Sequence, residues 1–77
     1  MVSEMTAPTR IATLEAPYGR EIRLHEVPFE SGMQLLRVTI REGRRITIID
    51  LDAATARSFA QAMSAWAATQ EDNSSKD

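Results

Sequence analysis

Residues 10 to 51 alternate between apolar and polar side chains with a period of two, which is typical of β-strands that bury one face. Each of the three glycines lies between two such stretches and marks a turn. The pattern predicts four antiparallel strands in sequence order, at about 10–16, 20–27, 33–41 and 45–51.

The first turn, APYGR (16–20), is the clearest of the three. Proline at the first loop position presets φ, and glycine at the third position can take the left-handed conformation of a bulged hairpin loop. A three-residue loop pairs Ala16 with Arg20 and Leu14 with Ile22. The apolar residues of both strands then lie on one face, so the turn chemistry and the hydrophobic pattern agree.

The second turn is a longer loop that ends at Gly32. If Val27 faces Met33 across this loop, Leu24 lies opposite Leu36, on the same face as the apolar residues of the first hairpin. We therefore expect this register for the second and third strands.

The third turn, around Gly43, is constrained by the face on which the following apolar residues fall. A two-residue Glu-Gly loop would place Ile46 and Ile48 on the face opposite to Ile40. A three-residue loop, or a bulge at the two arginines that follow the glycine, pairs Ile40 with Ile46 and keeps one apolar face. We expect this shifted register.

From Asp52 onward the apolar residues recur at i, i+3, i+4 and i+7, which is the spacing of one face of an α-helix. Eight of the sixteen residues from Ala53 to Ala68 are alanine, the best helix former. Asp52 suits the N-cap, where its carboxylate meets the positive end of the helix dipole. The apolar stripe, which we expect to be core rather than a ligand site, comprises Ala56, Phe59, Ala60, Met63, Trp66 and Ala67.

Together these elements predict an α+β fold, a four-stranded antiparallel meander with one C-terminal helix packed on one face (ββββα, two layers). With 77 residues, the chain is long enough for one domain only. Neither the first nine nor the last eight residues continue the periodic pattern. We expect a flexible arm at 1–9, a single domain at 10–69 and a disordered polar tail at 70–77.

The second face of the predicted sheet carries both charged and apolar residues, and one helix cannot cover both faces. Its apolar end would form a patch larger than soluble monomers usually expose. We therefore expect a second copy of the chain to pack there with two-fold symmetry, or another protein to do so. Two alternatives stay open, a different strand register and an arm at 1–9 that folds back over the patch. The expected interface comprises Ile11, His25, Val27, Met33, Leu35, Ile49 and Leu51.

The residue types that carry most catalytic chemistry are scarce in this chain. It has no cysteine, which excludes disulfides, thiolate metal sites and cysteine catalysis. Its only histidine, His25, has no serine near it in the predicted strand map and lacks the further ligands of a zinc site. Glu15 and Glu21 face each other beside a turn, where we expect them to pair with neighbouring arginines. We expect a non-enzymatic protein with no cofactor and no metal.

Arginine is the one unusual component of the composition. The formal net charge of the whole chain is −2, but residues 10–69 hold eight arginines against seven acidic residues. Arginine binds phosphate through two parallel hydrogen bonds and stacks on bases, so a group of arginines on a sheet edge suits single-stranded nucleic acid. The predicted strands expose no aromatic residue for stacking, so nucleic-acid binding is the alternative to protein association. The arginines concerned are Arg23, Arg37, Arg41, Arg44 and Arg45.

Membrane and export signals are missing from the pattern. The first residues lack the apolar run of a signal peptide, and the longest apolar runs are too short to span a bilayer. We therefore expect a cytoplasmic protein without a membrane partner.

Three stretches of the sequence resemble a known family: APYGREIRL (16–24), LRVTIREGRRITIIDLD (36–52) and AMSAWA (62–67). They are similar to a family of short bacterial proteins, mostly proteobacterial, that is classed as a domain of unknown function. The resemblance covers about residues 10–68 and implies no catalytic residues. The predicted order of four strands and a helix also resembles one protomer of the PC4-like single-stranded-DNA-binding coactivators, which are dimers, although a shared fold does not imply a shared function.

Overall fold

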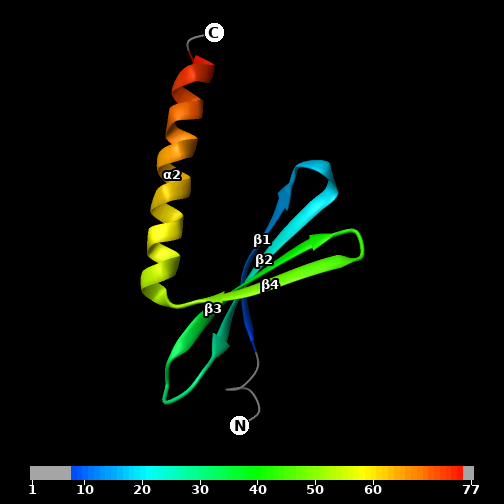
Figure 1. The fold of residues 1–77 in the computed structure, drawn as a ribbon, viewed down its shortest axis with the longest axis vertical. Helices are drawn as coiled ribbons and strands as arrows, with labels where there is room; N and C mark the ends of the chain where they lie inside the picture. The colour runs from blue at the N-terminus through cyan, green and yellow to red at the C-terminus, as the bar shows by residue number, and fades with distance from the viewer. Residues whose placement is uncertain (1–7, 76–77) are drawn as a thin grey trace.

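A computed structural model describes residues 8–75 as one sheet followed by one long helix (Figure 1). The four strands are antiparallel and neighbour one another in sequence order, β1-β2-β3-β4. This arrangement confirms the predicted α+β class and the ββββα order. The elements are β1 (Thr9–Ala16), the 3-10 turn η1 (Pro17–Gly19), β2 (Arg20–Pro28), β3 (Gln34–Glu42), β4 (Arg45–Leu51) and α2 (Ala53–Ser75).

The first hairpin has the predicted register. Ala16 pairs with Arg20 and Leu14 pairs with Ile22 across η1. Gly19 has a φ of 72° and Tyr18 a φ of 67°, so the loop turns through two left-handed residues. The guanidinium carbon of Arg20 lies 5.7 Å from the centre of the Tyr18 ring, which places a cation over an aromatic face beside the turn.

The second hairpin differs from the prediction by two residues. Val27 pairs with Leu35 rather than Met33, and Leu24 pairs with Val38 rather than Leu36. The loop is wider than expected because the Phe29 backbone N–H donates to the carbonyl of Met33 at 2.8 Å, which takes Met33 into the loop. A shift of two residues leaves every side chain on its predicted face.

The third hairpin overturns the predicted register of β4. Glu42 pairs with Arg45 across a two-residue loop, so Ile40 lies opposite Thr47 instead of Ile46. Gly43 has a φ of 59° at the first loop position, the glycine placement that suits a tight hairpin matched to strand twist. The local turn preference therefore sets the register of β4.

This one-residue difference moves two isoleucines to the other face of the sheet. Ile46 pairs with Arg41 and Ile48 with Thr39, on the side away from Val38. The face that they leave stays apolar because Ile49 takes the place opposite Val38. The alternation of β4 is therefore compatible with both registers, and the turn decides between them.

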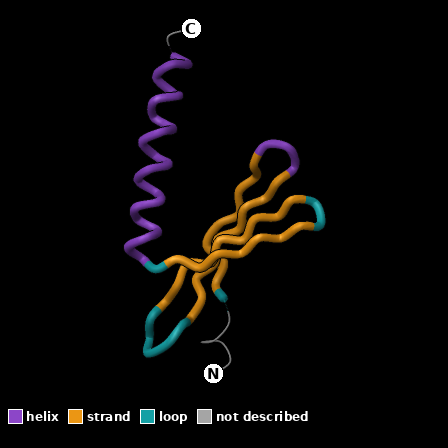
Figure 2. Tube along the Cα trace, viewed as in Figure 1, coloured by secondary structure: helices purple, strands orange, loops and turns teal. Residues whose placement is uncertain are grey.

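The helix does not lie across the sheet, contrary to the predicted two-layer packing. It rises from the end of β4 and runs away from the strands (Figures 1 and 2). Its contact with the sheet is mainly through β3, and Phe59, Met63 and Trp66 are 45%, 51% and 66% exposed. The helix stripe is therefore not a core within one chain.

The junction between β4 and α2 explains this placement. Only Asp52 separates Leu51, the last strand residue, from Ala53, the first helical residue. The Thr55 backbone N–H donates to Asp52 Oδ1 at 2.8 Å, and the Ala56 N–H donates to the Asp52 carbonyl at 2.9 Å. These bonds confirm Asp52 as the N-cap. A connection of one residue leaves no loop that could turn the helix back over its own sheet.

The ends of the elements also differ from the prediction. The helix continues to Ser75, although a disordered tail was expected from residue 70. Adding residues to a helix that has already formed costs little free energy, and Gln70 and Glu71 are good helix formers. The polar end of the chain therefore continues the helix. Strand β1 begins at Thr9, inside the expected arm. The rest of that arm, residues 1–7, and the last two tail residues, 76–77, lie outside the described residues.

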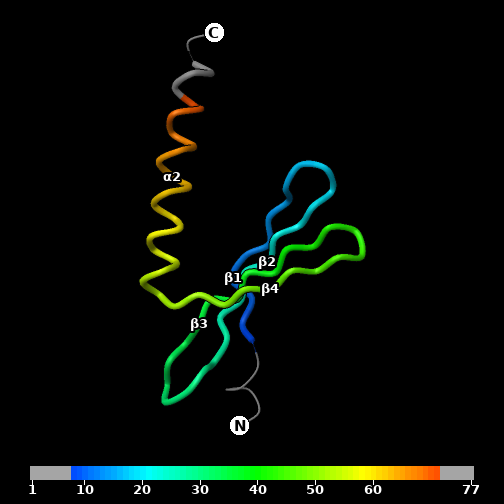
Figure 3. Tube along the Cα trace, in the orientation of Figure 1, coloured from blue at the N-terminus to red at the C-terminus, as the bar shows by residue number. Residues whose placement is uncertain are grey.

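The chain has an extended shape for its length (Figure 3). Its radius of gyration is 15.6 Å and its extents are 54 × 30 × 18 Å, whereas a compact domain of this length has a radius of about 11.5 Å. Val38 is the only buried residue in the described part of the chain, at 7% exposure. The single chain thus has strands and a helix but almost no core.

Candidate interaction surface

Strand pairing sorts the side chains of the sheet onto two faces of different character. We call the first the apolar face, since its two central rows are aliphatic except for Thr47 on β4. The rows that define it are Ala12–Leu24–Val38–Ile49 and Leu14–Ile22–Ile40, followed by Leu36–Leu51 toward the helix. The opposite side, the polar face, carries Thr13, Glu15, Glu21, Arg23, His25, Val27, Leu35, Arg37, Thr39, Arg41, Ile46, Ile48 and Asp50.

The apolar face is open in the single chain. Val38 at its centre is buried, but Leu14 is 52% exposed and Ile49 is 43% exposed. The remaining aliphatic residues of the face are half-buried. A sheet normally covers such a face with a second layer, which the described residues of this chain do not supply.

A second apolar surface runs along α2. We call it the helix stripe and define it by Phe59, Met63 and Trp66, flanked by Ala56, Ala60 and Ala67 at helical spacing. The three large side chains are each 45% or more exposed. Sequence reasoning placed them in a core, and the signal that could have revealed their exposure is the single residue between β4 and α2.

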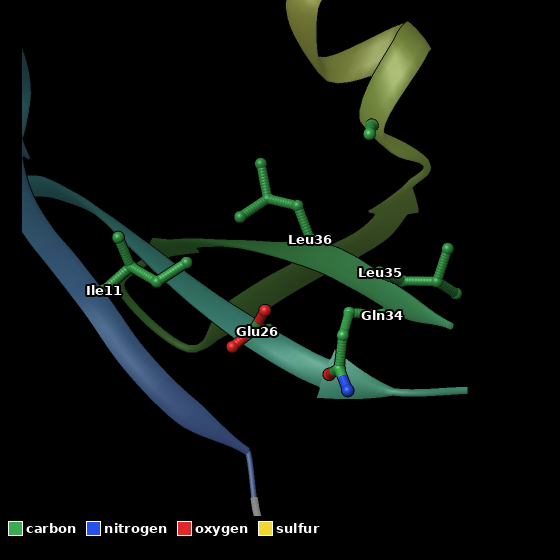
Figure 4. Close-up of a pocket in the computed structure, with 6 residues that line it drawn as sticks. Ile11, Glu26, Gln34, Leu35 and Leu36 are labelled. Carbon is green, nitrogen blue, oxygen red and sulfur yellow. The ribbon is translucent and has the colours of Figure 1, made fainter. Parts of the chain in front are cut away.

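The apolar face and the start of α2 meet in a shallow pocket of about 210 Å³. Ile11 and Leu36 point to the side of the sheet from which the helix rises (Figure 4). Ile11 reaches this position because the register of β1 shifts there, as a β-bulge. Glu26 is the one ionisable residue of the pocket, whose full lining is Ile11, Glu26, Gln34, Leu35, Leu36 and Ala53.

The structure does not bring the seven predicted interface residues together into one patch. The two-residue loop at Gly43 transfers Ile49 and Leu51 to the apolar face, while His25, Val27 and Leu35 stay on the polar face. Ile11 lies at the bulge, and Met33, 48% exposed, lies in the loop between β2 and β3. The apolar face, predicted as covered core, is instead partly open, and on the polar face Ile46 and Ile48 are 57% and 53% exposed.

The arginines predicted as a nucleic-acid contact are likewise divided. On the polar face, Arg23 Nε donates to Glu21 Oε1 at 2.8 Å. Arg37 donates from Nε to Asp50 Oδ1 at 2.9 Å and from Nη2 to Oδ2 at 3.1 Å. Arg41 shares this face, whereas Arg44 lies in the third turn and Arg45 pairs opposite Glu42 on the other face. Two of the five guanidinium groups are thus engaged by carboxylates of the same chain.

Hydrogen bonds lower the pKa values of the two aspartates at the junction of β4 and α2. The bidentate bond from Arg37 lowers the pKa of Asp50, and the same contact raises the pKa of Arg37. The bonds from Thr55 at the helix start lower the pKa of Asp52. Both carboxylates are therefore held in the charged form by structural contacts.

Other polar groups show pairing rather than convergence on a site. Glu15 faces Glu21, as predicted, at the edge of an open polar hollow of about 430 Å³ beside the first turn. His25 sits on the polar face, opposite Arg10 and Arg37. Among the residues that the structure describes, no group of three or more His, Asp or Glu side chains is placed to hold a metal.

The comparisons with known proteins bear on family membership alone. No curated protein and no solved structure matches the chain significantly. Within residues 8–75, no helix combines the length and the apolar character needed to cross a lipid bilayer. Residues 5–69, most of the chain, match the model of one family, and the chain therefore belongs to the Family of unknown function (DUF6967).

Proposed function

We propose that the chain is a non-enzymatic binding module that acts through protein–protein association, as a homodimer. The observation that carries this proposal is the simultaneous exposure of the apolar face and the helix stripe. Soluble monomers rarely expose contiguous apolar patches of this kind, and such patches mark interaction sites.

The accessible surface of the chain supports association quantitatively. It measures 6509 Å², whereas a compact monomer of this mass, 8.6 kDa, exposes about 4,700 Å². The excess is about 1,800 Å² per chain. If only half of it is covered, two copies together bury about 1,800 Å², within the range of stable protein interfaces.

A second copy is favoured over an unrelated protein because the chain carries two surfaces that complement each other. The sheet lacks a covering layer, and the helix stripe lacks a surface to pack on. A two-fold pair supplies each surface with its complement without any further component. The polar side chains also support a non-enzymatic role, since acids and arginines of the polar face bind each other.

Charge placed on the helix stripe tests this proposal. Met63→Glu puts a carboxylate into the proposed interface, where an unpaired buried charge costs about 3 kcal/mol or more. We expect the dissociation constant, measured by sedimentation equilibrium, to rise by about 100-fold or more. Met63 is 51% exposed in the single chain, so the variant should keep its helix content in circular dichroism.

The matched control is Gln61→Glu, which adds the same charge two residues away, nearly opposite the stripe on the helix. It should leave the dissociation constant within about twofold, as expected of an exposed site. Equal dissociation constants for both variants and the unmodified chain would refute the proposal.

A second candidate function is binding of single-stranded nucleic acid. It is favoured by Arg41, Arg44 and Arg45, which form no salt bridge with any side chain that the structure describes. Phosphate contacts make such binding fall steeply with salt. Fluorescence anisotropy with a short oligonucleotide should then show salt-dependent binding that Arg41→Ala/Arg45→Ala weakens. Absence of binding at low salt removes this function.

A further inference from the structure

We infer that the homodimer forms by exchange of helices, with α2 of each copy covering the apolar face of its partner's sheet. This inference rests on the proposed function and adds which elements meet in the pair. Each copy would then contribute Phe59, Met63 and Trp66 to the core that completes the other copy.

The junction at Asp52 argues against closure of the helix onto its own sheet. The two hydrogen bonds from the first helical turn fix the chain direction immediately after β4. The helix consequently leaves the sheet as a separate arm (Figures 1 and 3). An arm with an apolar stripe, attached through a connection too short to fold back, is the arrangement in which elements exchange between copies.

The dimensions of the two surfaces match. The helix has 23 residues and is about 34 Å long, while β2 and β3 have nine residues each and extend about 30 Å. The helix is therefore long enough to cover the full length of the central strands. Phe59 and Met63 lie in the half of the helix that follows the junction and Trp66 just beyond its midpoint, so they can reach the middle of a facing sheet.

Exchange covers both surfaces of a two-fold pair with a single kind of contact. If two sheets packed face to face, the helix stripes would remain in solvent. If two helices packed against each other alone, both apolar faces would stay open. Helix-on-sheet packing across copies buries both, and coverage of half of the excess surface gives an interface of about 1,800 Å², within the range of stable protein interfaces.

The chain contains no cysteine, so introduced thiols can test the exchange without background. Leu24→Cys marks the apolar face beside Val38, and Phe59→Cys, Met63→Cys or Trp66→Cys marks three levels of the helix stripe. The sheet variant and one differently tagged helix variant are unfolded, mixed, refolded and oxidised. We expect at least one mixture to give a disulfide-linked heterodimer on a non-reducing gel.

The other outcomes identify what has failed. Ile48→Cys on the polar face, mixed with the same helix variants, is the matched control and should give no link. A dimer in which Leu24→Cys or Met63→Cys links only to itself overturns the exchange but leaves the homodimer intact. A dimer with no heterologous link in any mixture also overturns the exchange. Light scattering that finds a monomer instead refutes the proposed function itself.

Discussion

Asp50 and Asp52 lie two residues apart where the sheet passes into the helix, and each holds a different part of the structure. Asp50 accepts both hydrogen bonds of Arg37 from the neighbouring strand. Asp52 accepts the backbone N–H of Thr55 and so caps the helix. Both contacts favour the carboxylate form, which lowers the two pKa values. The charged state of these acids thus links strand pairing to the start of the helix.

The lowered pKa values predict that the folded chain loses stability in acid. An unfolded aspartate has a pKa of about 3.9, so the stabilisation is fully present above that value. It is lost as the pH falls through 3.9 toward the lower folded pKa, because the unfolded chain then binds more protons. We expect the urea midpoint of unfolding to be lower at about pH 3 than at about pH 6.

The double variant Asp50→Asn/Asp52→Asn separates these acids from the others. Asparagine still caps a helix, so the variant should fold. Its urea midpoint should depend less on pH than that of the unmodified chain. An identical pH dependence in the two proteins would show that these contacts do not shift the pKa values.

At the scale of elements, Gly43 decides which side chains β4 gives to each face. Its φ of 59° is a left-handed conformation that costs a residue with a Cβ about 1–2 kcal/mol. A Cβ added there meets no heavy atom within 4 Å, so the whole cost lies in the backbone. Gly43→Ala should therefore lower the free energy of unfolding by about 1–2 kcal/mol in urea denaturation.

Asparagine tolerates the left-handed conformation better than alanine does, which gives a graded control. Gly43→Asn should lose less stability than Gly43→Ala. If the two variants are equally stable, the positive φ at this turn does not determine the hairpin.

The sequence allowed the strands, the order of elements and the first hairpin to be predicted, because Pro17 and Gly19 leave one loop length. It did not allow the register of β4 to be predicted. Ile46 and Ile48 alternate as well as Ile49 and Leu51 do, so the pattern supports either face. Packing of the helix was missed for another reason. Periodicity shows that an apolar stripe must be covered, but it does not show which copy of the chain supplies the surface.

A further prediction at this scale concerns the contribution of the helix stripe to association. Trp66 is an aromatic anchor of the helix stripe and is 66% exposed in the single chain. Truncation of such anchors in an interface costs about 2 kcal/mol or more. Trp66→Ala should raise the dissociation constant, measured by sedimentation equilibrium, by about 30-fold or more.

Tyr18 provides the aromatic control for this variant. It lies at the tip of the first turn, 91% exposed and away from both apolar surfaces. Tyr18→Ala should leave the dissociation constant unchanged. If Trp66→Ala behaves in the same way, the helix stripe is not part of the interface.

At the scale of the whole molecule, one copy of the chain has the parts of a two-layer domain without the contact between its layers. Its radius of gyration of 15.6 Å reflects a helix that extends away from the sheet. Two copies with exchanged helices would each gain the missing layer, so folding and association would be one event. The partner then supplies the buried contacts that one short chain lacks.

Light scattering during size-exclusion chromatography at micromolar concentration tests this central claim most directly, because it reports the molar mass of the unmodified chain. We predict a single species of about 17 kDa, twice the 8.6 kDa of one chain. A single species of 8.6 kDa would mean that the apolar face and the helix stripe remain uncovered or meet within one chain, and it would contradict the homodimer.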